Sequence, residues 1–171
     1  MTLLSAPDDT TLGLRDRALL AVLYSTGLRA AEVVAFDLGQ VDLSAGEVAS
    51  RDRRGRARPA FLGHQARAQL DEYLLHARPR FVGATCSRAL FLSRKGERLS
   101  VRSVEHIVRT YGRQVGLSIT PRDLRLACAT HLRQGGATAT AIKGLLGTVT
   151  IGPRGPAGGA KPLDRPLYGE V

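Results

Sequence analysis

The apolar segment at residues 14–24 is the feature that most constrains how this chain can fold. Its apolar side chains recur at helical spacing, and Gly27 follows as a helix stop. The longest apolar run, residues 18–24, is far too short to span a bilayer. The segment therefore predicts a helix buried in the core of a globular domain.

Length and charge narrow the class of protein. The 171 residues are 43% hydrophobic, which is enough for one core, and the net charge of +10 favours a polyanionic partner such as nucleic acid. An Arg-rich genome would give the same excess of charge. The two cysteines have no metal-ligand spacing, and the N-terminus has no signal-peptide pattern. We therefore expect a cytoplasmic protein without a metal site, a cofactor or a membrane anchor.

The rest of the chain predicts an α+β fold that is mostly helical, with a small antiparallel hairpin sheet. Three short strands at 41–43, 47–50 and 57–62 are separated by turn residues, and residues 89–92 form a further apolar strand-like run. Helical patterns with plausible caps occupy the remainder. These predicted helices cover residues 30–36, 65–77, 100–115, 122–134 and 137–146.

The C-terminal segment has a different composition. Residues 151–166 contain four Gly and four Pro, too few bulky side chains to offset the entropy of ordering the backbone. We expect a folded domain over residues 1–148 and a flexible tail over 149–171. The tail carries Tyr168, the only Tyr in the last third of the chain.

Two motifs resemble those of the catalytic domain of tyrosine recombinases and phage integrases. Residues 26–33, Thr-Gly-Leu-Arg-Ala-Ala-Glu-Val, are similar to the first arginine motif of that family. Residues 119–132, Ile-Thr-Pro-Arg-Asp-Leu-Arg-Leu-Ala-Cys-Ala-Thr-His-Leu, are similar to the second, and Leu-Leu-Gly at 145–147 follows in the family's order. The resemblance implies DNA strand cleavage and rejoining.

The chemistry of that reaction gives each motif residue a role. Two fixed guanidiniums stabilise the extra negative charge of a pentavalent phosphate, and the resemblance assigns this to Arg29 and Arg125. A Tyr phenol both attacks phosphorus and later leaves, which makes Tyr168 the candidate nucleophile of a 3'-phosphotyrosyl intermediate. The alternatives are ion pairs, of Arg29 with Glu32 or Asp37 and of Arg125 with Asp123, and an ordinary tail aromatic at position 168.

Three positions depart from the family pattern. A gapless count from Arg29 through residues 59–63 places Arg53 where the family has a hairpin Lys. Within the motifs themselves, Arg122 stands where the family has the His of His-x-x-Arg, and Thr148 where it has the His after Leu-Leu-Gly. Arginine holds its proton too firmly to act as a general acid. In addition, Tyr168 lies 20 residues after Thr148, about double the family's usual interval.

The hairpin arginines Arg51, Arg54, Arg56 and Arg58, with Arg53, form a patch that we expect to bind DNA phosphates. A solvated loop is the alternative. The family's N-terminal core-binding domain has no counterpart here, so the chain reads as a fragment with weak, salt-dependent binding. For His131, helix packing is the favoured role.

The partner expected from the resemblance is double-stranded DNA, with room for several copies of the chain assembled on it. A recombinase catalytic domain is the leading hypothesis. A catalytically impaired DNA-binding remnant or regulator is the alternative, and a basic helical module for RNA or a protein is a third.

Overall fold

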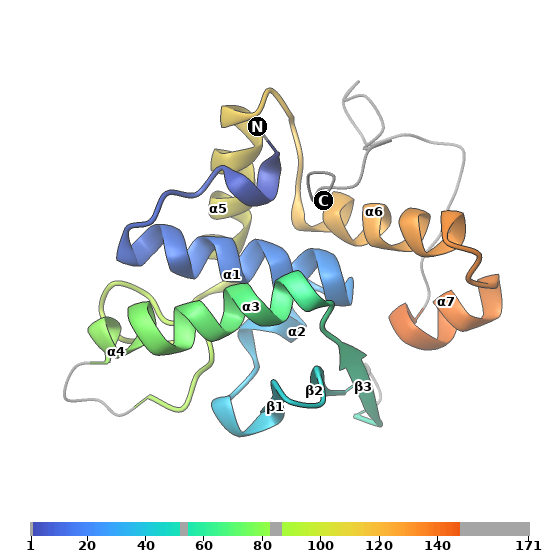
Figure 1. Cartoon of the computed structure of the whole chain (residues 1–171), viewed down its shortest axis with the longest axis horizontal. Helices are drawn as coiled ribbons and strands as arrows, with labels where there is room; N and C mark the ends of the chain where they lie inside the picture. The colour runs from blue at the N-terminus through green and yellow to red at the C-terminus, as the bar shows by residue number, and fades with distance from the viewer. Residues whose placement is uncertain (1, 52–54, 83–86, 148–171) are drawn as a thin grey trace.

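The computed structural model describes residues 2–51, 55–82 and 87–147, and helices form more than half of this part of the chain (Figure 1). The longer helices are α1 (Thr11–Thr26), α3 (His64–Glu72), α5 (Val101–Gln114), α6 (Pro121–Gln134) and α7 (Ala139–Leu146). The shorter ones are α2 (Ala30–Val34), α4 (Arg78–Phe81), η1 (Leu3–Ser5), η2 (Leu38–Gln40) and the π-helical turn η3 (Tyr73–Ala77).

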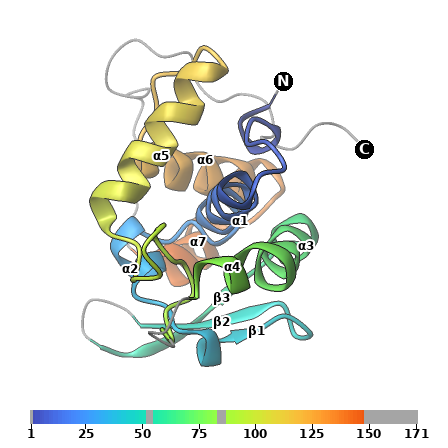
Figure 2. The same ribbon diagram turned by 90° about the vertical axis from the view of Figure 1, so that its left-hand side faces the viewer.

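Helix α1 is the centre of the hydrophobic core. It begins where the Thr10 hydroxyl accepts a hydrogen bond from the Gly13 amide, and it ends at Gly27, whose φ of 57° is left-handed. Every residue from 18 to 23 is at most 1% exposed. Figure 2 looks nearly along α1 and shows the other helices and the sheet arranged around it. The predicted buried helix is confirmed.

The sheet is antiparallel, in the order β1 (Val41–Asp42), β2 (Glu47–Arg51) and β3 (Ala57–Phe61). Side chains alternate between its faces, and Val48 opposite Ala60 is buried against the helices. Ser50 opposite Arg58 lies on the same face two residues further along. The three predicted strands are confirmed.

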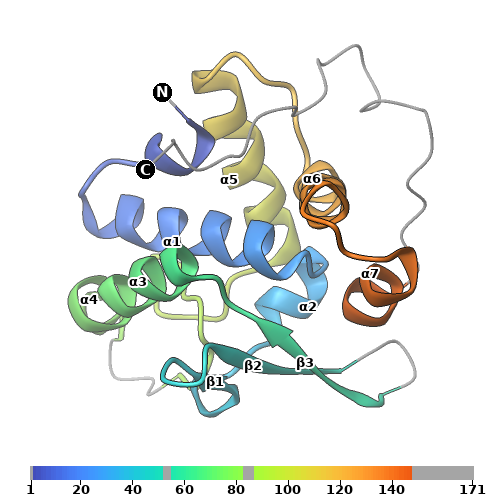
Figure 3. The same ribbon diagram turned by 45° about the vertical axis from the view of Figure 1, so that its right-hand side comes forward.

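Helices α6 and α7 form an extension beside the C-terminal end of α1 (Figure 3). Helix α6 begins at Thr120, whose amide and hydroxyl both donate to the Asp123 carboxylate, over 2.9 and 2.7 Å. Its apolar face packs on α7 in a small separate cluster of Cys128, Ala129, Ile142 and Leu146. Contacts of α6 with α1 place the second arginine motif next to the first.

Two predicted elements differ from the structure. Residues 89–92 form only isolated bridges, Asp37 with Ala89 and Leu92 with Arg98, instead of a strand. Part of the backbone is satisfied by a side chain, because Arg78 donates to the carbonyl oxygens of Ala89 and Leu90, while the Leu90 amide donates to the carbonyl oxygen of Phe36. The predicted helix at 65–77 extends to residue 81, through the π-helical turn η3 and then α4.

Within the described residues, no helix combines the length and the apolarity that crossing a bilayer requires.

Candidate active site

Arg29 lies in the short connection between α1 and α2, and its position is fixed by Glu32. The Arg29 amide donates to Glu32 Oε2 over 2.7 Å, as a residue at the N-cap of a helix does. The Arg29 guanidinium also forms an ion pair with the same oxygen, over 3.7 Å, so the alternative partner Glu32 is present beside it, and the Arg29 side chain is 33% exposed. The main chain is therefore held firmly while much of the guanidinium still faces solvent.

Arg125 lies in α6 and is almost completely buried. Its Nη1 donates to the carbonyl oxygen of Gly27 over 2.6 Å, and its Nη2 donates to the carbonyl oxygen of Leu146 at the end of α7. Burial, followed by the nearby charge of Arg29, lowers the pKa of Arg125 to about 10. The guanidinium is still charged at neutral pH, and the two predicted phosphate ligands share one electrostatic site. Asp123, the alternative ion-pair partner of Arg125, instead accepts a hydrogen bond from the Thr120 hydroxyl at the start of α6.

A third guanidinium, that of Arg58 on β3, reaches the same place. Its Nη2 donates to Glu32 Oε1 over 3.2 Å, and its Nη1 donates to the carbonyl oxygen of Leu145 over 2.7 Å. Glu32 therefore stands between Arg29 and Arg58. Sequence reasoning treated Arg58 as one of the hairpin arginines and missed this inward position. The alternation of β3 was the available signal, since Arg58 shares a face with the buried Ala60.

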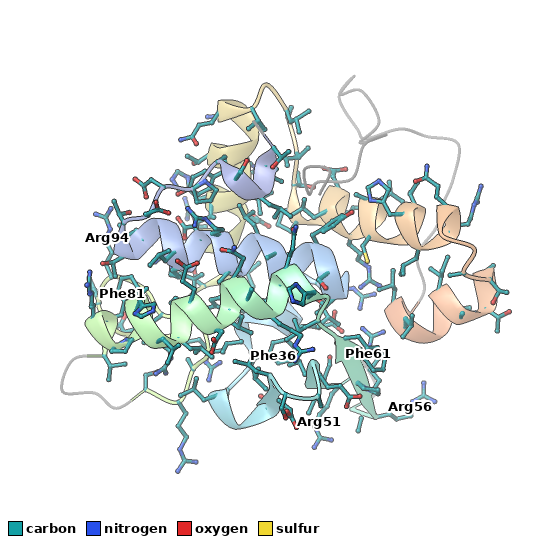
Figure 4. All side chains as sticks on the ribbon, in the orientation of Figure 1. Phe36, Arg51, Arg56, Phe61, Phe81 and Arg94 are labelled. Atoms are coloured by element: carbon teal, nitrogen blue, oxygen red, sulfur yellow. The ribbon has the colours of Figure 1, made fainter. Side chains whose placement is uncertain are left out.

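The other hairpin arginines are exposed where the structure describes them. Arg51 donates to the carbonyl oxygen of Gly55 over 3.0 Å. Figure 4 shows Arg51 and Arg56 at the hairpin end of the sheet, with Arg56 pointing away from the body of the domain. Arg53 and Arg54 lie outside the described residues. A role for these arginines in DNA binding stays a prediction.

The three altered positions and the candidate nucleophile are only partly described. Arg122 is exposed in the first turn of α6. Thr148 and Tyr168 lie outside the described residues, as does the predicted tail at 149–171. Their roles stay predictions.

His131 packs against α1. Its Nδ1 is 2.6 Å from the Tyr24 hydroxyl, and the two rings meet edge to face with centroids 5.7 Å apart. This contact joins α6 to α1 and agrees with the packing role that we favoured for His131.

Three guanidiniums around one carboxylate leave the site with an excess of positive charge. Fixed guanidiniums suit a phosphate whose non-bridging oxygens gain charge during a reaction. Held by a helical core beside a small hairpin sheet, such a cluster defines the catalytic domain of a tyrosine recombinase. In the comparison with protein families, the model described as "Phage integrase family" matches residues 1–151. The chain therefore belongs to the phage integrase family.

Individual relatives agree with this assignment. The chain is 42% identical over 156 residues to tyrosine recombinase XerC of Pelotomaculum thermopropionicum, covering 87% of this chain and 51% of the relative. It is 40% identical over 148 residues to tyrosine recombinase XerD of Pseudomonas aeruginosa, covering 85% of this chain and 50% of the relative. The chain thus spans about half the length of the curated relatives it matches.

Solved structures share the fold. The crystal structure of XerA recombinase superposes with a TM-score of 0.75 at 26% identity, over 87% of this chain and 53% of that one. The XerH site-specific recombinase bound to its difH substrate superposes with a TM-score of 0.73 at 20% identity, over 87% and 45% of the two chains. Membership of the family rules out the third hypothesis, an unrelated helical module.

Proposed function

We propose that this chain is the catalytic domain of a site-specific DNA recombinase that cleaves and rejoins DNA through a 3'-phosphotyrosyl intermediate. The observation that carries the proposal is the meeting of Arg29 and Arg125. They come from two motifs 96 residues apart, yet Arg125 donates over 2.6 Å to the carbonyl oxygen of Gly27, two residues before Arg29, and the charge of Arg29 contributes to the lowered pKa of Arg125. A DNA phosphate placed between them would be held by both.

In the proposed reaction the phenol of Tyr168 gives its proton to water as its oxygen attacks phosphorus, the bond from phosphorus to the 5' oxygen breaks, and that oxygen takes up a proton from water. Arg29 and Arg125 stabilise the charge on the non-bridging oxygens. The positions expected to handle the proton carry Arg53, Arg122 and Thr148. A general acid typically contributes about 10²–10⁴-fold, so we expect cleavage to be slow.

The proposed partner is double-stranded DNA. The structure of the Tn1549 transposon integrase, which has the same fold with a TM-score of 0.68, is a complex with transposon right end DNA. The net charge of +10 and the exposed Arg51 and Arg56 supply attraction to phosphates. We also propose that more than one copy assembles on DNA and that the protein acts in the cytoplasm.

A nicked suicide duplex tests the proposal, because loss of the short cleaved fragment traps the covalent intermediate. Incubation with a panel of such duplexes and denaturing electrophoresis should show a protein-DNA adduct, and Tyr168→Phe should abolish it. Absence of an adduct on every duplex would contradict the enzymatic part. Arg53→Lys should increase the yield of adduct, and no increase would mean that position 53 does not donate the proton.

A further inference from the structure

We infer that Arg58 is a positioning residue for the phosphate clamp, because by pairing with Glu32 it leaves the charge of Arg29 available to DNA. This inference rests on the proposed function. It gives Arg58 a role distinct from that of the exposed hairpin arginines, and it explains why a basic residue of β3 faces inward.

The geometry around Glu32 separates the two arginines. Oε1 accepts a hydrogen bond from Arg58 Nη2 over 3.2 Å, whereas Oε2 accepts the backbone amide of Arg29 and lies 3.7 Å from its guanidinium. The carboxylate is therefore hydrogen-bonded to the side chain of Arg58 but only to the main chain of Arg29. The side chain of Arg58 is 13% exposed, against 33% for Arg29.

Charge explains what Arg58 does for Arg29. Glu32 is 15% exposed, and a carboxylate at that depth needs a partner. Arg29 already forms a long ion pair with Glu32, at 3.7 Å and without a side-chain hydrogen bond. If Arg58 were neutral, we expect the guanidinium of Arg29 to move onto the carboxylate in its place and to be lost to a phosphate. One substitution would therefore lower the net charge of the site by one, and the charge lost to DNA would be that of Arg29.

Arg58 also holds the end of α7. Its Nη1 donates to the carbonyl oxygen of Leu145, while Arg125 takes the next carbonyl along the helix, that of Leu146. Two arginines of the site thus cap the C-terminal end of α7. The described part of the chain ends at residue 147, two residues after Leu145.

The dependence of DNA binding on salt provides the test. Each phosphate contact adds about 0.9 to the slope of log K against log salt. With a fluorescein-labelled duplex, Arg58→Met should reduce the slope by about 0.9, an affinity loss of about eightfold in 0.1 M salt, since Arg29 becomes paired with Glu32. Adding Glu32→Gln to Arg58→Met should restore the slope, because Gln keeps the oxygen that accepts the Arg29 amide but carries no charge.

Control variants distinguish a positioning role of Arg58 from a purely structural role and from a general effect of lost charge. Arg109→Met removes the same charge from an exposed position of α5 and should leave the slope unchanged. Adding Arg29→Met to Arg58→Met should reduce the slope no further. If Arg58 were only structural, Glu32→Gln would not rescue Arg58→Met, and that result would overturn the inference. A wild-type protein that does not bind any duplex would instead overturn the proposed function, and this inference with it.

A conservative variant covers the case in which Arg58→Met does not fold. Arg58→Lys supplies a single ammonium, which we expect to stay with the Glu32 carboxylate and not with the Leu145 carbonyl. The wild-type slope should then be kept, while amide hydrogen exchange at the end of α7 becomes faster. A reduced slope with unchanged exchange would contradict the assignment.

Discussion

Arg125 donates a hydrogen bond over 2.6 Å to the carbonyl oxygen of Gly27, and this contact fastens α6 to the turn that ends α1. The same guanidinium donates to the carbonyl oxygen of Leu146 at the end of α7. One side chain therefore joins three helices where the two arginine motifs meet. The residue proposed to bind the phosphate also holds the site together.

The double role of Arg125 can be measured with Arg125→Lys. Lysine keeps the positive charge but lacks the fork that serves two carbonyls, so at least one buried oxygen loses its donor. The free energy of unfolding should fall by about 1–3 kcal/mol in urea denaturation. Arg133→Lys, at an exposed position of the same helix, is the control. Equal stability of the two variants would show that these carbonyl contacts contribute little.

Gly27 is required for two separate reasons, its left-handed φ of 57° and the closeness of its neighbours. A Cβ at this position would lie 2.7 Å from Leu146 Cδ2 and 3.0 Å from Cys128 Sγ. Gly116 has a φ of 75° but nothing within 4 Å of such a Cβ. We expect Gly116→Ala to cost about 1 kcal/mol through backbone strain alone, and Gly27→Ala to cost about 1–3 kcal/mol more through overpacking.

Calorimetric melting of both Gly→Ala variants checks this difference. A melting temperature of Gly27→Ala no lower than that of Gly116→Ala would mean that α7 moves aside without cost. The seating of α7 against Gly27 would then be looser than the structure shows.

Local signals account for what could be predicted from the sequence. The helix stop at Gly27 and the caps at Ser100 and Thr120 are formed by neighbouring residues, so their pattern is visible in a short window. Strand alternation likewise predicted the sheet. The strand expected at residues 89–92 did not form because its backbone partners are divided between the backbone of other segments, such as Phe36, and side chains such as that of Arg78, which no strand pattern reveals.

The site was predictable only in part, because its contacts join side chains to backbone groups far away in the sequence. The motifs indicated Arg29 and Arg125, but they did not indicate that Arg125 binds the carbonyl oxygens of residues 98 and 21 positions away. Every residue has a backbone carbonyl oxygen, so the residue types at positions 27 and 146 do not indicate that these oxygens bind Arg125. The inward position of Arg58 could have been predicted from its alternation with Ala60.

The contact between Tyr24 and His131 should stabilise the junction of α1 and α6. Their hydrogen bond is 2.6 Å long and joins residues 107 positions apart. In a double-mutant cycle of Tyr24→Phe and His131→Ala, we expect a coupling energy of about 0.5–1.5 kcal/mol, measured by urea denaturation. Additive effects of the two substitutions would show that the pair contributes by packing alone.

The buried thiol of Cys128 should make stability fall at alkaline pH. Burial raises the pKa of Cys128 from its ordinary value of 9.0 to about 11. Below pH 9 both states keep the proton, whereas between pH 9 and 11 the unfolded chain releases it and the folded chain retains it. The unfolded state therefore gains free energy as the pH rises, by up to about 2–3 kcal/mol over that interval.

Cys128→Ala removes this contribution and isolates it. The pKa values of Tyr73 and Tyr111 are also raised, to about 12, but both tyrosines are present in each protein, so their effects cancel in the comparison. Unfolding in urea under reducing conditions should give a constant difference between wild type and variant from neutral pH to pH 9. Above pH 9 the wild type should lose stability relative to Cys128→Ala. Parallel curves throughout would mean that the thiol titrates in the folded protein as it does in the unfolded chain, and that the contact between α6 and the turn at Gly27 admits water.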